Sequence, residues 1–293
     1  MRSKWWRSGV ATLSAGLILQ TGCSFARKVA VGQMVPIIEN ATEGARERSD
    51  LQLVAQALPA NLLLVDGLIR TDPKNKALLA TSSFLHFGYA LGFVEEDSLE
   101  LASQYYATGR DHGLRSLDSR KPFARQRNGT LEEFERALKV LKRIDVPALA
   151  WTTANWGRWI SLNLESPAAI AQQPRLEAML NRLLQLDPGF EAGLPHVLRG
   201  MFDAMRPEML GGQPDSARVH FERAFALGGD ANLLYRVFYA EFYCRQVLDE
   251  ACFDAALVAV AQADAAAVPQ FTLMNEIARR RARRLLARRD EMF

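Results

Sequence analysis

The sequence of 293 residues lacks most features that mark enzymes or nucleic-acid-binding proteins. It has three cysteines and four histidines, and no histidine lies in a metal-ligand spacing such as H-E-x-x-H. Neither a phosphate-binding glycine loop nor a G-x-S-x-G motif occurs. The net charge is only +3, and a mildly acidic body with a basic tail is not the charge distribution of a nucleic-acid-binding protein. We therefore expect no catalytic residues, no metal, no cofactor and no nucleic-acid partner.

No segment shows the two-residue alternation of a β-strand. Instead, apolar residues recur at three- and four-residue spacing, and proline and glycine separate these stretches. This pattern predicts an all-α protein whose short connections pair successive helices antiparallel. An interruption is expected near Pro59. The expected helices span 51–70, 75–96, 130–143, 175–186, 194–205, 215–227, 231–245 and 252–265, with further helices starting near 98, 147 and 271.

The N-terminus is typical of a bacterial export signal over residues 1–22. Three basic residues precede an apolar run of eleven residues, which is too short to span a membrane. The LQTGC segment resembles a lipoprotein box, which makes Cys23 the expected lipidation site, although plain secretion is the alternative. The expected location is the bacterial periplasm, with a lipid anchor in the outer membrane because Ser24 follows the cysteine. No later stretch is expected to reach membrane-spanning length.

The rest of the chain divides into three segments. Residues 23–50 are polar and predict a lipidated tether or a loosely packed first helix, residues 51–270 a helical repeat domain, and residues 271–293 a basic C-terminal helix or tail. Seven arginines lie in the last fifteen residues; they either contact anionic lipid head groups or form a solvated end. Cys244 and Cys252 are either a disulfide that closes a short helix–turn–helix or two buried thiols.

A repeat pattern is clearest in DSARVHFERAFALG, where Ala217, Phe221 and Ala224 are spaced four and three residues apart. This is the second-helix pattern of a tetratricopeptide repeat, in which small residues let neighbouring helices approach and an aromatic residue fills the gap. LNRLLQLDPGF and LLLVDGLIRTDPKN have similar endings. The sequence therefore predicts TPR-like helical hairpins that bury their apolar faces by stacking. His220 lies beside Phe221, which favours a structural role for it.

Aromatic residues are the best candidates for a binding site. Trp offers a large apolar surface with one hydrogen-bond donor, which suits a partly apolar ligand with a polar end. The alternative is that these side chains only pack the core and the repeat interfaces. The candidate cavity residues are Tyr105, Tyr106, Trp151, Trp156, Trp159, Tyr235 and Tyr239.

Taken in order, several segments resemble the T component associated with TRAP transporters. They are LPANLLLVDGLIRTDPKNKALL, WTTANWGRWI, LDPGFEAGLPHVLRG, LGGQPDSARVHFERAFAL and YAEFYCRQVLDEACFDAAL, and they cover most of residues 57–258. The positions that match the family are Cys23, Trp151, Trp156, Gly211, Gly212, His220 and Phe221. Gln20 in the lipoprotein box and the arginine-rich C-terminus depart from the pattern.

The resemblance implies a homotrimeric periplasmic lipoprotein with a pore or cavity through each protomer. It also implies a partnership with the transporter's substrate-binding protein, to which apolar, fatty-acid-like ligands would pass. Two alternatives stay open at this point. One is a TPR-like envelope scaffold that mediates protein assembly without a ligand, and the other is a helical enzyme with an acidic pocket.

Overall fold

The computed structural model describes residues 8–206, 209 and 211–293, with side chains from Ala26 onward. Every regular element in these residues is helical, which confirms the all-α class. The side chains of Cys23 and of the whole expected export signal therefore lie outside the described part. The α-helices are α1 (Ser8–Arg46), α2 (Leu51–Thr71), α3 (Lys76–Tyr89), α4 (Leu99–Leu117), α5 (Lys121–Gln126), α6 (Leu131–Leu138), α7 (Val146–Ser161), α8 (Pro167–Ile170), α9 (Gln173–Leu186), α10 (Phe190–Asp203), α11 (Pro214–Ala226), α12 (Leu234–Phe238), α13 (Glu250–Gln262) and α14 (Thr272–Ala287).

Short polar residues start many of these helices. Each accepts a hydrogen bond from the backbone N–H three residues on, which satisfies a donor that the first helical turn leaves free. Thr130 and Glu133 do this reciprocally and form the capping box of α6. The other side-chain caps are Asp50, Asn75, Ser98 and Asp249.

Two helices end in a wider π-helical turn. The turn η1 (Ala90–Val94) follows α3, and η5 (Tyr239–Cys244) follows α12. Such turns insert an extra residue into the helical ladder and often occur at functional sites. Here they carry Glu95, immediately after η1, and Glu241, inside η5. Both carboxylates reach the chamber described below.

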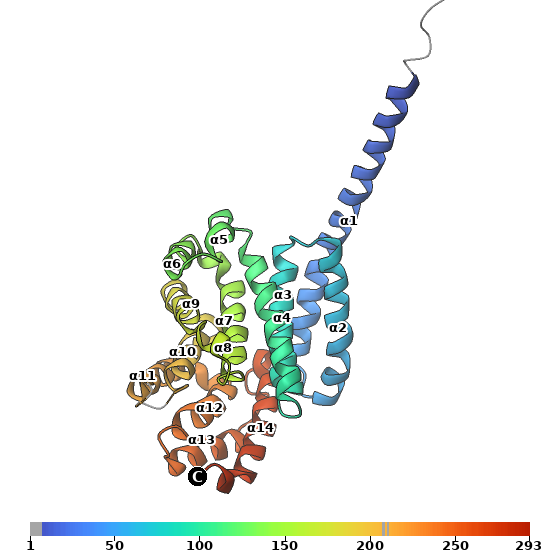
Figure 1. The fold of residues 1–293 in the computed structure, drawn as a ribbon. Helices are drawn as coiled ribbons and strands as arrows, with labels where there is room; N and C mark the ends of the chain where they lie inside the picture. The colour runs from blue at the N-terminus through green and yellow to red at the C-terminus, as the bar shows by residue number, and fades with distance from the viewer. Residues whose placement is uncertain (1–7, 207–208, 210) are drawn as a thin grey trace, which may run out of the picture.

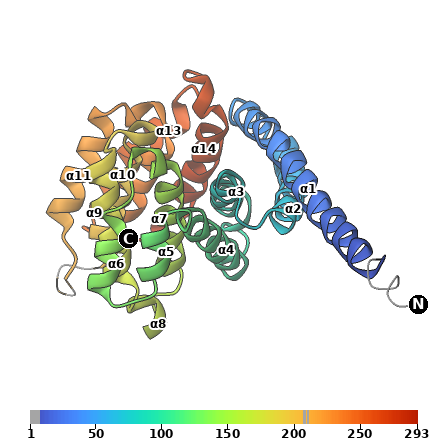
Figure 2. The ribbon, with the colours of Figure 1, turned by 90° about the horizontal axis from the view of Figure 1, so that it is seen from above.

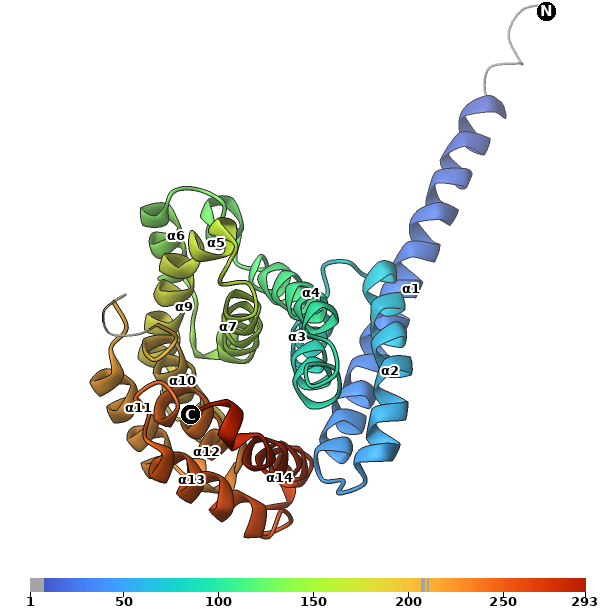
Figure 3. The same cartoon turned by 60° about the horizontal axis from the view of Figure 1, so that its bottom comes forward.

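The helices from α3 to α14 curve around a common centre, while α1 and α2 lie along one side (Figures 2 and 3). The main core runs through the curved part and includes Tyr106, Phe134, Phe221 and Phe253. A second cluster joins α1 and α2 to α3 and α14. The N-terminal half of α1 extends away from the rest of the molecule (Figure 1).

The expected alternatives for residues 23–50 include a first helix, which the structure has up to Arg46. Residues 23–46 continue as α1, which becomes buried at Val31 and Val35, 4% and 8% exposed. The expected interruption near Pro59 is wrong, because α2 passes through it. Proline removes one backbone hydrogen bond, but the buried row on either side, which includes Val54 and Leu62, holds the helix straight against its neighbours.

Two helical stretches are long and apolar enough to cross a membrane by length and composition, contrary to expectation. They are Leu51–Thr71 and Lys76–Val94, and the most apolar windows are 33% and 61% buried inside the protein. The second stretch packs against α4 and α7. Its apolar composition therefore serves the core.

A disulfide joins Cys244 to Cys252, with the Cα atoms 5.6 Å apart. It spans the turn at Leu248, whose φ of 55° lies in the left-handed region. The bridge therefore closes the connection between η5 and α13, where the sequence left a disulfide and two free thiols as alternatives.

The basic C-terminal segment forms the helix α14, which buries one face and leaves Arg283 and Arg284 exposed. In α14, Ile277, Ala278 and Ala282 are buried. Arg281 is 6% exposed and pairs with two glutamates. Helix α14 packs against α13, α12, α2 and α1. It therefore connects the two ends of the molecule.

Candidate functional site

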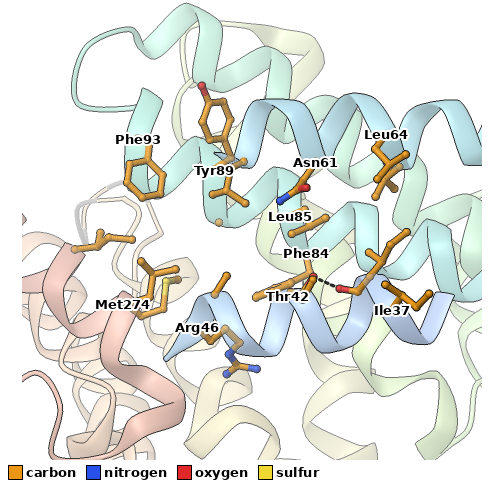
Figure 4. Close-up of a pocket in the computed structure, with 18 of the residues that line it drawn as sticks. Ile37, Thr42, Arg46, Asn61, Leu64, Phe84, Leu85, Tyr89, Phe93 and Met274 are labelled. Carbon is orange, nitrogen blue, oxygen red and sulfur yellow. Dashed lines mark hydrogen bonds between the residues drawn. The ribbon is translucent and has the colours of Figure 1, made fainter. Parts of the chain in front are cut away.

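An apolar groove lies between α1, α2, α3 and α14 (Figure 4). It encloses a cavity of about 160 Å³, and an apolar cavity of about this size is large enough to hold benzene. Most of its walls are aliphatic or aromatic. Representative residues are Ile37, Ile38, Leu64, Leu85, Phe93 and Met274. The groove therefore suits an apolar guest.

Among the described residues, only four with polar side-chain groups line this groove: Thr42, Arg46, Asn61 and Tyr89. The Thr42 hydroxyl donates to the Ile38 carbonyl oxygen at 2.8 Å, so its hydrogen is already used within α1. Arg46 pairs with Glu191 at 2.6 Å. Its Nε is buried and has no hydrogen-bond partner. Arg46 thus forms a polar end of the groove and keeps one unpaired hydrogen-bond donor.

Arg46 stays charged despite its burial. Burial lowers the pKa of the guanidinium, but the Glu191 carboxylate opposes this and leaves the pKa above its ordinary value. Glu191 has a left-handed backbone with φ of 48°, which is uncommon for a residue with a side chain. The Tyr235 hydroxyl donates to the Glu191 carbonyl oxygen at 2.5 Å. This hydrogen bond and the ion pair with Arg46 fix the left-handed backbone at the start of α10.

A larger chamber of about 920 Å³ lies where α7, α10, η1, η5 and α14 meet. Its lining is strongly charged and of both signs. The acidic residues are Glu95, Glu96, Asp97 and Glu241, and the basic ones are Arg158, Arg245, Arg281, Arg284 and Arg288. Asp97, Arg245, Arg284 and Arg288 are exposed, so the chamber opens to the solvent.

Glu95 is the centre of the buried charge network beside this chamber. Its side chain is 3% exposed and pairs with both Arg158 and Arg281, the latter at 3.0 Å. The Tyr106 hydroxyl also donates to it at 2.5 Å. Arg281 in turn pairs with Glu241 at 2.7 Å. Glu95 therefore links α4, α7 and α14, and Arg281 extends the network to η5.

The network sets the charge state of Glu95. Burial by itself raises the pKa of this carboxyl group, but the charges of Arg158 and Arg281 outweigh it and lower the pKa to about 2. Burial and the Glu95 charge raise the pKa of Tyr106 well above its usual value. Glu95 is therefore ionised and Tyr106 neutral at physiological pH. Glu95 therefore lacks the raised pKa that a general acid needs.

The seven aromatic residues expected to line a cavity do not lie in the apolar groove. Tyr106 and Tyr235 are buried hydrogen-bond donors, as described above. Trp156 donates from Nε1 to Gln172 at 2.8 Å, and Trp159 stacks on Arg110 with 4.9 Å between guanidinium carbon and ring centroid.

The other three aromatic candidates lie elsewhere. Trp151 packs on Phe84 and lines a shallow neighbouring pocket of about 260 Å³, into which Arg46 also projects. Tyr105 contacts Tyr89, which itself lines the groove. Tyr239 stacks on the ring of Tyr243.

The repeat-motif residues pack the α10–α11 hairpin. Ala217, Phe221 and Ala224 are fully buried, and a Cβ on Gly200 would come within 2.8 Å of the Phe221 ring. Gly211 has φ of 84° in the preceding turn, and Gly212 follows it. These contacts show that the three residues pack within the α10–α11 hairpin, and the TPR-like repeat itself stays a prediction.

The four histidines form two spatial pairs that their sequence spacing does not indicate. His86 and His112 have ring centroids 5.5 Å apart, and His196 and His220 join Nδ1 to Nδ1 at 2.8 Å. Burial lowers the pKa of all four; for His112 and His196, the partner histidine lowers it further, to about 4. All four rings are therefore neutral at pH 7.

The residues of the groove on α1 were missed in the sequence because the segment is polar on average. A signal exists nevertheless, since Met34, Ile37, Ile38, Ala41 and Ala45 recur at helical spacing. The pattern predicts one apolar face. It does not say which helices cover that face, because α14 is more than two hundred residues away in the sequence.

Comparisons with known proteins agree with this architecture. The sequence model of the family described as TRAP transporter T-component matches residues 47–293. An uncharacterized protein of Treponema pallidum (strain Nichols) is 27% identical over 266 residues, which cover 84% of this chain and 81% of that protein. The family match spans the groove residues of α2, α3 and α14 and the whole chamber, whereas the groove residues of α1 precede it.

Proposed function

The chain belongs to the TRAP transporter T-component family, and from this premise we propose that it binds a partly apolar ligand and passes it to the transporter's substrate-binding protein. Membership makes it an accessory component of a TRAP system, in a transporter family rather than an enzyme family. The proposed ligand site is the groove between α1, α2, α3 and α14. No catalytic residues are proposed.

The observation that carries this proposal is the pairing of an apolar groove with one unsatisfied donor. Burying apolar surface of the ligand in the groove is favourable in proportion to its area. The free Nε of Arg46 favours a ligand whose head group accepts hydrogen bonds. A fatty-acid-like carboxylate combines both properties. The large hollow beside α14 further supports a role in ligand handling over that of a solid scaffold.

The setting of the protein is also part of the proposal. A lipid on Cys23 would anchor the chain in the outer membrane on its periplasmic side. The eight residue steps of α1 from Cys23 to the first buried contact at Val31 would then form a stalk of about 12 Å. Assembly as a homotrimer and pairing with the substrate-binding protein are proposed from the family resemblance. Light scattering of the mature protein should then give three times the protomer mass.

The ligand site can be tested with a matched pair of glycine substitutions. Gly88 and Gly67 both lie in helices and both have open space where a Cβ would be. Only Gly88 lines the groove. We expect Gly88→Leu to weaken displacement of a fluorescent fatty acid by laurate at least tenfold, because the new side chain fills the cavity. Gly67→Leu should leave the affinity unchanged.

A second variant tests the polar end. Arg46→Gln should weaken laurate binding about tenfold, in line with a lost charge-assisted hydrogen bond. The same substitution should weaken the binding of dodecanol less, because dodecanol carries no charge. Wild-type protein that binds neither compound, while still binding its substrate-binding protein, would favour the scaffold function. Equal loss in Gly88→Leu and Gly67→Leu would show that the groove is not the site.

A further inference from the structure

Three helices bring together one carboxylate and two imidazoles outside the groove and the chamber. They are Asp66 of α2, His86 of α3 and His112 of α4. Each offers a ligand atom within 4.8 Å of the other two. Their separations in the sequence match no metal-binding motif, so only the packing of the three helices reveals the cluster.

Ser82 orients both imidazoles from one turn earlier on α3. The Nδ1 atom of His86 lies 2.8 Å from the Ser82 carbonyl oxygen. A carbonyl oxygen only accepts, so Nδ1 carries the hydrogen, and Nε2 of the neutral ring keeps its lone pair. The Nδ1 atom of His112 lies 2.8 Å from the Ser82 hydroxyl oxygen, which can accept as well as donate. Metal-binding histidines are typically held in this way, through the nitrogen that does not bind the metal.

The Asp66 carboxylate supplies a second, independent indication. Its Oδ1 atom is buried and has no hydrogen-bond partner. Leaving a buried acceptor unpaired is unfavourable. A cation bound between Asp66 and the two imidazoles would satisfy this oxygen. Asp66 and His112 are only partly buried, whereas His86 is 3% exposed, so an ion can enter from the solvent side.

We propose that Asp66, His86 and His112 bind one divalent transition-metal ion, and that Zn²⁺ occupies the site. Two imidazoles and one carboxylate suit zinc, which binds these ligands at about 2.0–2.2 Å. Tetrahedral ligand atoms lie roughly 3.4 Å apart. Since the three ligand atoms lie within 4.8 Å of one another, no pair would have to close by more than about 1.4 Å. The remaining coordination position is left for water.

The ion would tie α2 to the α3–α4 hairpin. Val65 and Leu85, the immediate neighbours of Asp66 and His86, line the apolar groove. The metal would therefore hold two walls of the groove at a set distance. Zinc binding itself does not depend on the groove having a ligand, so the two proposals succeed or fail separately.

The test is zinc binding to the purified full chain without a histidine tag, measured by competition with a chromophoric chelator. We expect one zinc per chain with micromolar or tighter affinity. Asp66→Asn and His112→Gln should each weaken it at least tenfold. Both residues are partly exposed, and circular dichroism in a chelator should show that the variants fold. His196→Gln is the matched control, because it alters the other histidine pair and should leave zinc affinity unchanged.

X-ray absorption at the zinc edge gives an independent readout and should show two imidazole ligands. Absence of zinc binding at micromolar concentrations would overturn the proposal. So would a loss of affinity in His196→Gln as large as that in His112→Gln, or a zinc spectrum without imidazole scattering.

Discussion

Among single residues, Glu95 bonds to side chains from three different helices, α4, α7 and α14. Arg158 and Arg281 neutralise it, and the Tyr106 hydroxyl completes its hydrogen bonding. A buried ion pair adds little net stability when complete, but removing one member leaves a charge with no solvent and no partner. The stability of the chamber wall should therefore depend on this carboxylate.

Glu95→Gln should lower the free energy of unfolding by about 3–5 kcal/mol, because two buried guanidinium groups lose their shared counter-charge. Urea unfolding followed by circular dichroism measures this. Glu132→Gln is the control, since Glu132 and Arg136 form an exposed pair, and it should leave stability nearly unchanged. A Glu95→Gln protein as stable as wild type would contradict the role assigned to the network.

The histidines predict a loss of stability in mild acid. The pKa of His196 falls from an ordinary 6.5 to about 4, owing first to burial and then to His220 and Arg223. Below pH 6.5 the unfolded chain therefore binds more protons than the folded chain. Stability from this group is complete above pH 6.5 and declines as pH falls toward 4.

His196→Gln should make this pH dependence shallower, by less than about 1 kcal/mol per pH unit because the ring is only partly desolvated. The measurement is urea unfolding at several pH values between 4 and 7.5 with a chelator present. Identical slopes for variant and wild type would show that His196 keeps an ordinary pKa.

Among the helices, α4 approaches α7 closely at Gly113. A Cβ on Gly113 would lie 2.0 Å from the Thr152 hydroxyl oxygen and 2.9 Å from that of Ser83. Glycine is needed here for space rather than for backbone conformation. The small size of Gly113 also helps α3, α4 and α7 to pack against one another.

Gly113→Ala should therefore destabilise the protein by about 1–3 kcal/mol through overpacking. The double variant Gly113→Ala with Thr152→Ala should recover part of the loss. It removes the Thr152 hydroxyl at 2.0 Å but leaves the Thr152 Cβ and the Ser83 hydroxyl oxygen, each at 2.9 Å. Gly67→Ala is the control. It meets open space and should raise stability by up to about 1 kcal/mol, because alanine favours a helix. Thermal unfolding distinguishes these outcomes, and a tolerated Gly113→Ala would show that α4 and α7 are farther apart.

For the whole molecule, α14 is the element on which both hollow regions depend. Leu273, Met274 and Ile277 line the groove, whereas Arg281 and Arg284 line the chamber. One helix thus provides a wall to each, at successive turns. Without α14, the helices α1 and α2 would lose the helix that also packs against α12 and α13.

A chain that ends at Val268 should lose cooperative unfolding and bind a hydrophobic dye, because both core clusters include residues of α14. A chain that ends at Ala287 keeps the helix and should unfold cooperatively. Calorimetry with dye fluorescence compares the two. Cooperative unfolding of the shorter chain would mean that the repeat domain folds without its last helix.

The sequence by itself determined the helices, because their periodicity, caps and breakers act within a few residues. The packing role of Ala217, Phe221 and Ala224 was readable for the same reason. The expected interruption at Pro59 is wrong because burial of α2 against neighbouring helices outweighs the local preference of proline. Only the tertiary structure decided where the hollows lie and which charges and imidazoles meet. The groove, the Glu95 network and the Asp66–His86–His112 cluster each join helices far apart along the chain, and no local pattern encodes such contacts.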